Sequence, residues 1–447
     1  MKIQKSAIGV FLEFADEYLN FEKTPEKNIF WLDTMEFLCN RLGNPQDEIP
    51  CFHVAGSKGK GSVSMMIASI LEENGNKTGL YSSPHILDFI ERIGTCKGPY
   101  DESVYEKSVR CLMESVNSIM TEELPGKRPV TWFELVTLLG FLCNKNAGCD
   151  YSVYEVGLGG RLDATNVIKP KCCCINQIEL EHTEFLGDTV EKIAAEKGGI
   201  IKQETPVFVA AQNDSVRNVF RNIAKERNAP IYFVDEVSKV SSITYENNRM
   251  QCKIESSFFK RPLNLSLAML GDFQTKNAAM AAIAVKQVLP DIDESIIETG
   301  LSKAKLPGRF EIEKNIVFDG AHTTNSIAFT LNTMEKVFGR DLNVHLLFGC
   351  AADKEVEKMS LMFKDRFSSI YLTKPGNVKA SDIDRARKAF DDAGLDYFCC
   401  GDYLKAIPYA LEKSKEAHAI LLVTGSFYLV SEVKKYLLSC KCLGTDN

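Results

Sequence analysis

The chain has 447 residues, of which 45% are hydrophobic, and it carries a formal net charge of −7. This length allows two sizeable cores, and the acidic balance argues against a general nucleic-acid or anionic-membrane surface. The short apolar stretch at residues 7–12 is followed by Glu13 and Asp16, so we expect no signal peptide. The most apolar later stretch, residues 419–430, is interrupted by a glycine and a serine and is too short to span a bilayer.

The 15 cysteines predict a reducing compartment, because their number is odd and no C-x-x-C pair occurs. Cys172, Cys173 and Cys174 sit together in the strand-like segment KCCCINQI. Thiols in such a segment behave as small apolar residues, so we predict core packing there rather than metal or redox chemistry. These features favour a cytoplasmic protein, and we expect a monomer.

The first part of the chain predicts a parallel sheet covered by helices on both faces, because strand-like and helix-like segments alternate from about residue 50 to 234. The expected strands are IPCFHVAG, KTGLYSS, DYSVYEVG, KCCCINQI, PVFVAA and PIYFV, and the expected helices lie near 61–74, 131–146, 188–202 and 214–227. A polar stretch at 236–268 predicts antiparallel strands or a hairpin, and an Ala-rich helix follows at about 275–289.

The segment LSKAKLPGRFEI, residues 301–312, predicts a domain junction, because it contains Pro307-Gly308 and separates two regions of similar pattern. We therefore expect one domain over 1–304 and a smaller Rossmann-like α/β domain over 305–447. The expected strands of the second domain are NIVFDG, NVHLLFGC, SSIYLT and HAILLVTGS, with helices near 324–337, 355–367, 381–394, 402–416 and 427–440.

The segment GSKGKGS follows the first strand and precedes an apolar-periodic helix, which is the context of a phosphate-binding loop. Its residues are Gly56, Ser57, Lys58, Gly59, Lys60, Gly61 and Ser62. The glycines let backbone N–H groups surround an anion, the helix presents its positive end, and a lysine supplies a charge for the phosphates. The spelling departs from the usual P-loop, which has glycine where Val54 stands and a hydroxyl residue directly after the lysine. A glycine-rich turn without a ligand is the alternative, and we favour nucleotide binding.

GSKGKGS resembles the G-T-N-G-K-G-S loop of the folylpolyglutamate synthase and dihydrofolate synthase family, within the Mur ligase group of ATP-dependent amide-forming enzymes. In that family the glycine between lysine and hydroxyl is normal. Further segments resemble family motifs in the same order along nearly the whole chain. They are GLYSSPHILDFIERI, YEVGLGGRLDATNVI, LEHTEFLGDTVEKIAAEKGGIIK, LPGRFEI, FDGAH and LVTGSFYLV. The resemblance implies a P-loop ATPase domain with a mainly parallel sheet, followed by a smaller α/β domain.

The resemblance also implies a catalytic centre made of Lys60, Glu155, His182 and Lys197. Ser83 and Glu155 would bind a first magnesium ion, and Glu155 and His182 a second. A carboxylate and a hydroxyl suit magnesium, whereas imidazole is not a ligand it favours, so His182 is assigned from the resemblance alone. Lys197 occupies the position of a lysine that family members carry as a carbamate, and Glu181 replaces the family's common Asp.

Further site residues follow from the same resemblance. Asn277, Arg309, Asp319 and His322 would contact ATP or the reacting centre, and Ser82, Phe133 and Asp163 would contact the folate or pterin. Two residues depart from the family pattern in these motifs: Phe273 stands where the family usually has His, and Thr323 stands where it usually has Asn.

The implied reaction has no protein nucleophile. A carboxylate of the acceptor attacks the γ-phosphorus of ATP, and the amine of L-glutamate then attacks the resulting acyl phosphate. The acceptor would be dihydropteroate, a reduced folate, or both, and we lean toward a bifunctional enzyme of bacterial type. The alternatives are folylpolyglutamate synthase activity alone, or a Mur-type ligase with another carboxylate acceptor. Only about fifty residues precede the loop, too few for an additional UDP-binding domain, and no N-K-x-D element for a GTPase is present.

Overall fold

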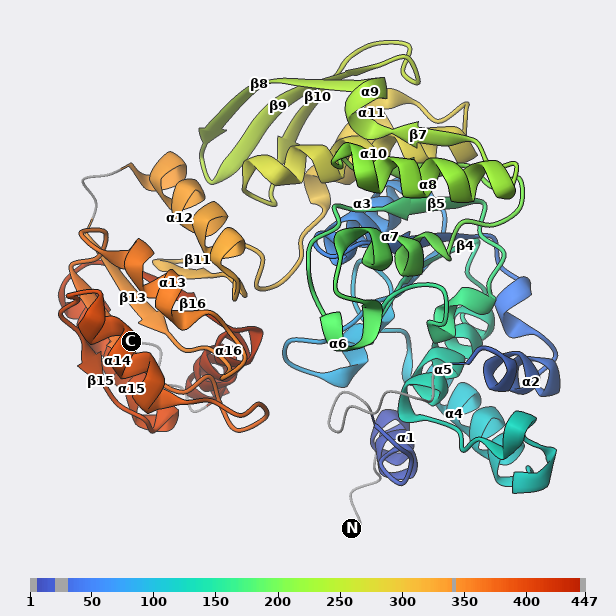
Figure 1. Ribbon diagram of the computed structural model, residues 1–447, viewed down its shortest axis with the longest axis horizontal. Coiled ribbons are helices and arrows are strands. Elements are labelled where there is room, and N and C mark those ends of the chain that lie inside the picture. The colour runs from blue at the N-terminus through green and yellow to red at the C-terminus, as the bar shows by residue number, and fades with distance from the viewer. Residues whose placement is uncertain (1–5, 21–30, 340–342, 443–447) are drawn as a thin grey trace. The chain divides into compact units, whose positions relative to one another are not determined.

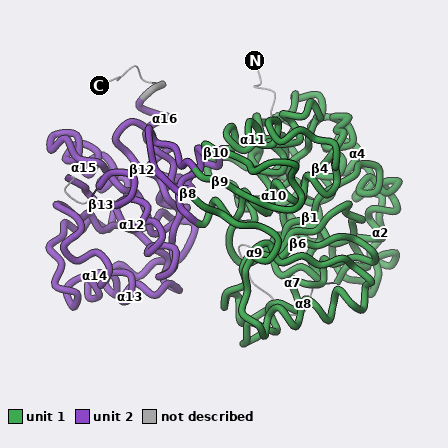
Figure 2. Tube along the Cα trace, turned by 90° about the horizontal axis from the view of Figure 1, so that it is seen from above, with its two compact units in different colours: residues 1–242, 252–266, 273–304 green, residues 243–251, 267–272, 305–447 purple. Residues whose placement is uncertain are grey.

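The computed structural model describes residues 6–20, 31–339 and 343–442 (Figure 1). The chain forms two compact units, coloured separately in Figure 2. Unit 1 consists of Met1–Ser242, Cys252–Ser266 and Phe273–Ala304, and unit 2 consists of Ile243–Gln251, Leu267–Asp272 and Lys305–Asn447. The division into domains at 304 and 305 stays a prediction, and two short segments before residue 304 group with unit 2.

Unit 1 contains a seven-stranded sheet in the order β3-β2-β4-β1-β5-β6-β7, in which only the β2–β3 pair is antiparallel. The strands are β1 (Cys51–Ala55), β2 (Thr78–Tyr81), β3 (Ile93–Gly94), β4 (Tyr151–Glu155), β5 (Cys172–Ile175), β6 (Val207–Val209) and β7 (Ile231–Phe233). The helices are α1 (Ala7–Ala15), α2 (Asp33–Arg41), α3 (Lys60–Glu73), α4 (Glu102–Asn117), α5 (Trp132–Asn146), α6 (Thr183–Leu186), α7 (Val190–Gly198), α8 (Asp214–Glu226), α9 (Val234–Val237), α10 (Asp272–Val288) and α11 (Glu294–Lys303).

Every residue of β1 and β5 is buried, which explains why their sequences, CFHVA and CCCI, lack the alternation of a half-exposed strand. Cys172, Cys173 and Cys174 are fully buried, as the predicted core packing requires. Helix α3 leads from β1 to β2 and packs on β1, β2 and β4, while α5 contacts β2 and β3. The phosphate loop therefore lies between a central strand and a helix that both belong to the core of unit 1.

A separate three-stranded sheet has the order β10-β9-β8, within the polar stretch where strands were predicted. Its strands are β8 (Ser238–Glu246), β9 (Arg249–Ser256) and β10 (Leu263–Leu267). The boundary between the two units passes through all three of these strands.

Unit 2 contains a six-stranded sheet in the order β11-β12-β16-β13-β14-β15, parallel except for the β11–β12 pair. The strands are β11 (Glu311–Glu313), β12 (Ile316–Phe318), β13 (Val344–Phe348), β14 (Ser369–Leu372), β15 (Phe398–Cys399) and β16 (Ile420–Thr424). The helices are α12 (Thr324–Phe338), α13 (Val356–Ser360), α14 (Ile383–Asp392), α15 (Tyr403–Glu416) and α16 (Phe427–Cys442). Two α/β units with mostly parallel sheets confirm the predicted fold class.

Two predicted helices are much shorter than expected. The helix expected at 188–202 begins only after Thr189, whose side chain accepts the N–H of Lys192 at 3.3 Å, and it ends at Gly198, before a second glycine. The helix expected at 355–367 stops at Ser360 and continues as a short 3-10 turn over Leu361–Phe363. Within the described ranges, no helix combines the length and apolar character that crossing a membrane requires.

Candidate active site

Three neighbouring parallel strands of unit 1 end at the same edge of the sheet. Val54 of β1 lies opposite Glu155 of β4, and Ala55 lies opposite Ile175 of β5. The phosphate loop, Glu155 and Asn176 therefore come together at the carboxyl edge, where open α/β sheets bind their ligands.

The loop turns into α3 through glycines with positive φ, 133° at Gly56 and 80° at Gly59. Gly59 is the N-cap of α3, and no side chain caps this helix end. The first N–H groups of a helix have no intrahelical acceptor, and together with the helix dipole they attract an anion. A Cβ atom on Gly59 would overlap the side-chain amide of Asn176 and would lie 2.9 Å from Oδ1 of Asn277. The backbone at the start of α3 is therefore suited to bind a phosphate group. Position 59 requires glycine, because any Cβ there would collide with Asn176.

Two lysines from different elements meet at the carbonyl oxygen of Gly56. Nζ of Lys60 donates to this oxygen at 2.9 Å, and Nζ of Lys197 donates to it at 3.0 Å. Lys197 is only 2% exposed and forms an ion pair with Glu181 at 2.9 Å. Burial, followed by the charge of Lys60, lowers the pKa of Lys197 to about 8, although Glu181 opposes the shift. The loop therefore has one lysine of its own and a second, readily deprotonated lysine beside it.

The segment after β5 holds the other side of the loop. The N–H of Ser57 donates to the carbonyl of Gln177 at 2.9 Å, and Oγ of Ser57 accepts the N–H of Glu179 at 3.0 Å. Partial burial opposes ionisation of Glu181, yet Lys197 and Lys60 lower the pKa of its carboxyl below the ordinary value. The replacement of Asp by Glu at 181 therefore keeps an anion next to Lys197.

A row of hydrogen-bonded side-chain amides lies next to the loop. Nδ2 of Asn176 donates to Oδ1 of Asn277 at 2.9 Å, Nδ2 of Asn277 donates to Oε1 of Gln274 at 2.8 Å, and Nε2 of Gln274 donates to Oγ of Ser62 at 3.3 Å. All four residues are buried. These hydrogen bonds link α10 to Asn176 after β5 and to Ser62 at the end of the loop. Asn277 therefore helps to hold the loop in place.

Of the predicted magnesium ligands, Glu155 lies at the carboxyl edge of the sheet next to the phosphate loop. It is 4% exposed, and Oε2 accepts the N–H of Ser83 at 3.3 Å, so the structure brings these two predicted residues together. A carboxylate and a hydroxyl at the edge of a phosphate loop are the oxygen donors that magnesium prefers, so this pair suits the ion. His182 is exposed, has φ 47°, and precedes α6 one residue after Glu181. Within the described residues, no group of three or more His, Cys, Asp or Glu side chains could hold a metal.

Unit 1 also contains a cavity of about 800 Å³ beside the loop that follows β4. Its lining is mainly apolar but includes the ion pair of Arg161 with Glu196, whose atoms lie 2.9 Å apart. The lining residues are Trp31, Leu32, Asp33, Leu158, Gly159, Gly160, Arg161, Leu162, Phe185, Leu186 and Glu196. Most of them lie in the two motifs YEVGLGGRLDATNVI and LEHTEFLGDTVEKIAAEKGGIIK, but none was predicted individually as a site residue.

The three predicted pterin residues lie near β2, β4 and α5. Phe133 packs so closely on Gly157 that a Cβ there would lie 3.0 Å from Cε2 of the ring. The N–H of Ser82 donates to the carbonyl of Arg92 at 2.9 Å. Asp163 is buried and accepts four hydrogen bonds, as described below. Their roles in acceptor binding stay predictions.

The carboxylate of Asp163 accepts hydrogen bonds from its own loop. Oδ2 accepts the N–H groups of Gly157 and Leu158 at 3.0 and 2.9 Å, and Oδ1 accepts both the N–H and the hydroxyl of Thr165. Burial raises the pKa of Asp163, although these hydrogen bonds oppose the shift. Asp163 therefore fixes the shape of the loop that lines the cavity.

In unit 2, the predicted residues gather around Phe427 at the start of α16. The guanidinium of Arg309 lies 4.3 Å from the centre of the Phe427 ring, and the His322 ring lies 6.1 Å from it. Asp319 accepts the N–H of Phe310 at 2.9 Å and that of Ala321 at 2.8 Å. Burial raises the pKa of Asp319, while the Arg309 charge opposes the shift. These groups form a compact polar cluster at the carboxyl end of β12.

The sequence matches two family profiles: the Mur ligase middle domain over residues 54–285, and the Mur ligase, glutamate ligase domain over residues 308–427. The first match alone covers more than half of the chain. The chain is therefore a Mur ligase, and the enzymes of this family are ATP-dependent ligases.

Curated relatives narrow the assignment. The dihydrofolate synthase/folylpolyglutamate synthase of Bacillus subtilis is 29% identical over 91% of this chain and 94% of that protein. The folylpolyglutamate synthase of Lacticaseibacillus casei is 30% identical over 90% of this chain and 94% of that protein. The crystal structure of folylpolyglutamate synthase from Thermotoga maritima is 27% identical, has a TM-score of 0.81, and is matched over 97% of both chains. Together with the loop, the two lysines and the buried carboxylate, these matches show that the chain belongs to the folylpolyglutamate synthase and dihydrofolate synthase family of Mur ligases.

Proposed function

We propose that this enzyme joins L-glutamate to a carboxylate of dihydropteroate or of a folate, with ATP as the source of energy. The names of the relatives that match 90% or more of the chain supply the acceptor class. The observation that carries the chemistry is the uncapped, glycine-lined start of α3, where Lys60 and Lys197 converge on one carbonyl. Such a site binds a polyphosphate and stabilises charge during phosphoryl transfer.

The proposed reaction proceeds in two steps. The acceptor carboxylate attacks the γ-phosphorus of ATP, which releases ADP and leaves an acyl phosphate. The amine of L-glutamate then attacks the activated carbonyl carbon, so that an amide forms and phosphate departs. In this proposal, positioning and electrostatic stabilisation supply the catalysis, because the reaction needs no protein nucleophile.

The residues of unit 1 have separate roles in the proposal. The N–H groups at the start of α3 bind the phosphates, and Lys60 leaves the Gly56 carbonyl to contact their terminal oxygens. Asn277 holds the loop in shape through Asn176. Lys197 can react with carbon dioxide, because its lowered pKa supplies the neutral amine that a carbamate requires. In unit 2, Arg309, Asp319 and His322 would contact the nucleotide or the reacting centre.

Magnesium would be held by Glu155 with Ser83, and His182 is a further candidate ligand. The ion would neutralise phosphate oxygens and so favour attack on phosphorus. The protein's own contribution is the placement of a buried carboxylate at the edge of the phosphate loop.

The acceptor would occupy the cavity of about 800 Å³ in unit 1, whose size and apolar lining suit a flat organic ring system. We propose a bifunctional enzyme that accepts both dihydropteroate and reduced folates, and that acts as a monomer in the cytoplasm. Folylpolyglutamate synthase activity alone is the second candidate, because the L. casei relative carries that single name.

An assay with radiolabelled L-glutamate tests the proposal. Purified enzyme receives ATP and magnesium with dihydropteroate or with tetrahydrofolate, and labelled product is separated from free glutamate. Incorporation with both acceptors is the expected result. Incorporation with tetrahydrofolate alone supports the second candidate, whereas no incorporation with either acceptor rules out the folate assignment. Light scattering gives the molar mass of the purified protein and so tests whether it is a monomer.

A further inference from the structure

Trp31 is an exposed aromatic residue on the wall of the cavity in unit 1. It lines the cavity together with Leu32, and 60% of its surface is exposed. The only other tryptophan of the chain, Trp132, is 5% exposed and packs in the core. A large apolar side chain that borders a cavity without being buried is a typical element of a ligand site.

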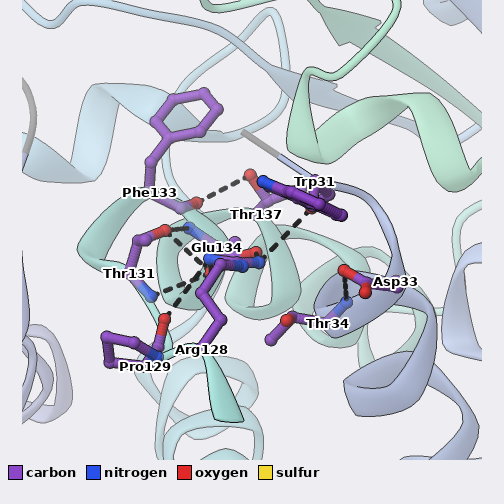
Figure 3. A network of polar contacts seen from close by, with 9 residues as sticks. All are labelled: Trp31, Asp33, Thr34, Arg128, Pro129, Thr131, Phe133, Glu134 and Thr137. Atoms are coloured by element: carbon purple, nitrogen blue, oxygen red, sulfur yellow. Dashed lines mark hydrogen bonds and ion pairs between the residues drawn. The ribbon is translucent and has the colours of Figure 1, made fainter. Parts of the chain in front are cut away.

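A largely buried ion pair holds the backbone of Trp31. Nη2 of Arg128 donates to the carbonyl of Trp31 at 3.3 Å, and Nη1 of Arg128 donates to Oε2 of Glu134 at 3.3 Å (Figure 3). Nη2 also contacts Oε1 of Glu134, so the guanidinium and the carboxylate meet in a two-pronged pair. The side chains are 11% and 7% exposed, respectively. The backbone of Trp31 is thus hydrogen-bonded to a largely buried ion pair.

The same ion pair fixes a neighbouring element. Glu134 accepts the N–H and the hydroxyl of Thr131 at 2.8 and 2.9 Å, and this capping box begins α5. Phe133 lies in the first turn, points away from the ion pair in Figure 3, and packs on Gly157 at the start of the loop that lines the cavity. The Arg128–Glu134 pair therefore links both sides of the cavity wall. Arg128 binds the backbone of Trp31, and Glu134 caps the helix whose Phe133 packs on Gly157.

We propose that the indole of Trp31 stacks on the planar ring of the acceptor, and that Arg128 and Glu134 are positioning residues that hold Trp31 in place. The inference rests on the proposed function, which supplies a flat heteroaromatic acceptor. Indole offers a broad π-face and few rotatable bonds, and the hydrogen bond from Arg128 to the Trp31 carbonyl reduces the backbone freedom that would be lost when a ligand stacks on the ring.

The first test compares Trp31→Ala, Trp31→Phe and the control Met120→Ala, which removes an equally exposed apolar side chain that lines no described cavity. Binding of dihydropteroate and of tetrahydrofolate is measured by titration calorimetry, and the KM for ATP is measured in parallel. Trp31→Ala should weaken acceptor binding by roughly tenfold or more, the range typical of one lost aromatic stack. Trp31→Phe should lose threefold or less, and the KM for ATP should stay constant in all three variants.

A double-mutant cycle tests the positioning role. Arg128→Lys keeps a cation for Glu134 but removes the forked donor that reaches the Trp31 carbonyl. This change should weaken acceptor binding in the wild-type background and have no further effect in Trp31→Ala, because Arg128 acts through Trp31. A purely structural role for Arg128 would weaken binding equally in both backgrounds, and that result would overturn the assignment.

The outcomes separate the inference from the function on which it rests. If the wild type incorporates glutamate and Trp31→Ala binds both acceptors as tightly as wild type, the stacking role is wrong and the proposed function stands. If the wild type neither binds nor uses either acceptor, the proposed function fails, and the stacking role fails with it.

Discussion

Replacing Lys197 with methionine should change how the stability of the protein depends on pH. Methionine keeps an unbranched side chain of similar length but removes the charge. Burial and the charge of Lys60 lower the pKa of Lys197 from 10.5 to about 8 in the folded protein. Because the unfolded chain keeps the proton up to about pH 10.5, it binds more protons than the folded chain between these two pH values. The free energy of unfolding of the wild type therefore rises with pH across this window.

The magnitude follows from the size of the shift. One pKa unit corresponds to about 1.4 kcal/mol, so a shift from 10.5 to about 8 destabilises the folded protein by roughly 3 kcal/mol at neutral pH. Most of this cost disappears by pH 10, where we expect the contribution of Lys197 to have risen by about 2.5 kcal/mol relative to pH 7. Lys197→Met should lack this rise. Other groups that titrate in this range are common to both proteins and cancel in the difference.

The assay is urea denaturation of wild type and Lys197→Met at pH 7, 8, 9 and 10, in EDTA and in buffer freed of carbon dioxide. The unfolding free energy of the wild type minus that of Lys197→Met should increase by about 2.5 kcal/mol from pH 7 to pH 10, because only the wild type gains from deprotonation of this amine. Parallel curves, with a difference constant to within about 0.5 kcal/mol, would show that Lys197 keeps an ordinary pKa and would refute the reasoning.

Gly59→Ala should abolish ATP binding, because its Cβ would overlap Asn176, whereas Gly75→Ala has a similar φ of 85° with nothing within 4 Å and should keep the wild-type KM for ATP. Equal KM values for ATP in both variants would contradict this steric argument. Glu155→Gln should lower kcat by roughly 100-fold or more while the far-ultraviolet circular dichroism stays unchanged, and wild-type turnover would exclude the assigned role. Asp163→Asn should lower the free energy of unfolding by about 3 kcal/mol in urea titrations, because its carboxylate accepts four hydrogen bonds. An unchanged stability together with a raised acceptor KM would instead favour direct contact with the acceptor.

Most of the fold could be predicted from the sequence because its strands are short, apolar and separated by amphipathic helices. Every residue of β1 and β5 is buried, and this environment favours the largely apolar runs CFHVA and CCCI that the sequence displays. The strand β15 was missed because two residues, Phe398 and Cys399, carry no periodic signal. The end of α7 was misplaced because the pattern of apolar residues continues past Gly198, where the helix itself stops.

The candidate site was predictable where local sequence determines geometry, as in the glycine loop. Where distant segments meet, local sequence patterns do not determine the geometry, and only the family resemblance placed such residues in one site. The convergence of Lys60 and Lys197 on Gly56 depends on the neighbouring positions of β1 and β5, which no local pattern records. The contact of Arg128 with Trp31 joins residues 97 positions apart. The four hydrogen bonds that Asp163 accepts from its own loop likewise depend on the folded backbone, which the sequence motif does not reveal.

The three-stranded sheet β8–β10 has a consequence for how the molecule can be divided or recombined. Each of its strands contributes residues to both units, so the chain passes between the units several times rather than once. A fragment ending at Ala304 would retain Ile243–Gln251 and Leu267–Asp272 without the partner they fold with. Exchange of Lys305–Asn447 with the corresponding part of a relative would have to carry these two segments along.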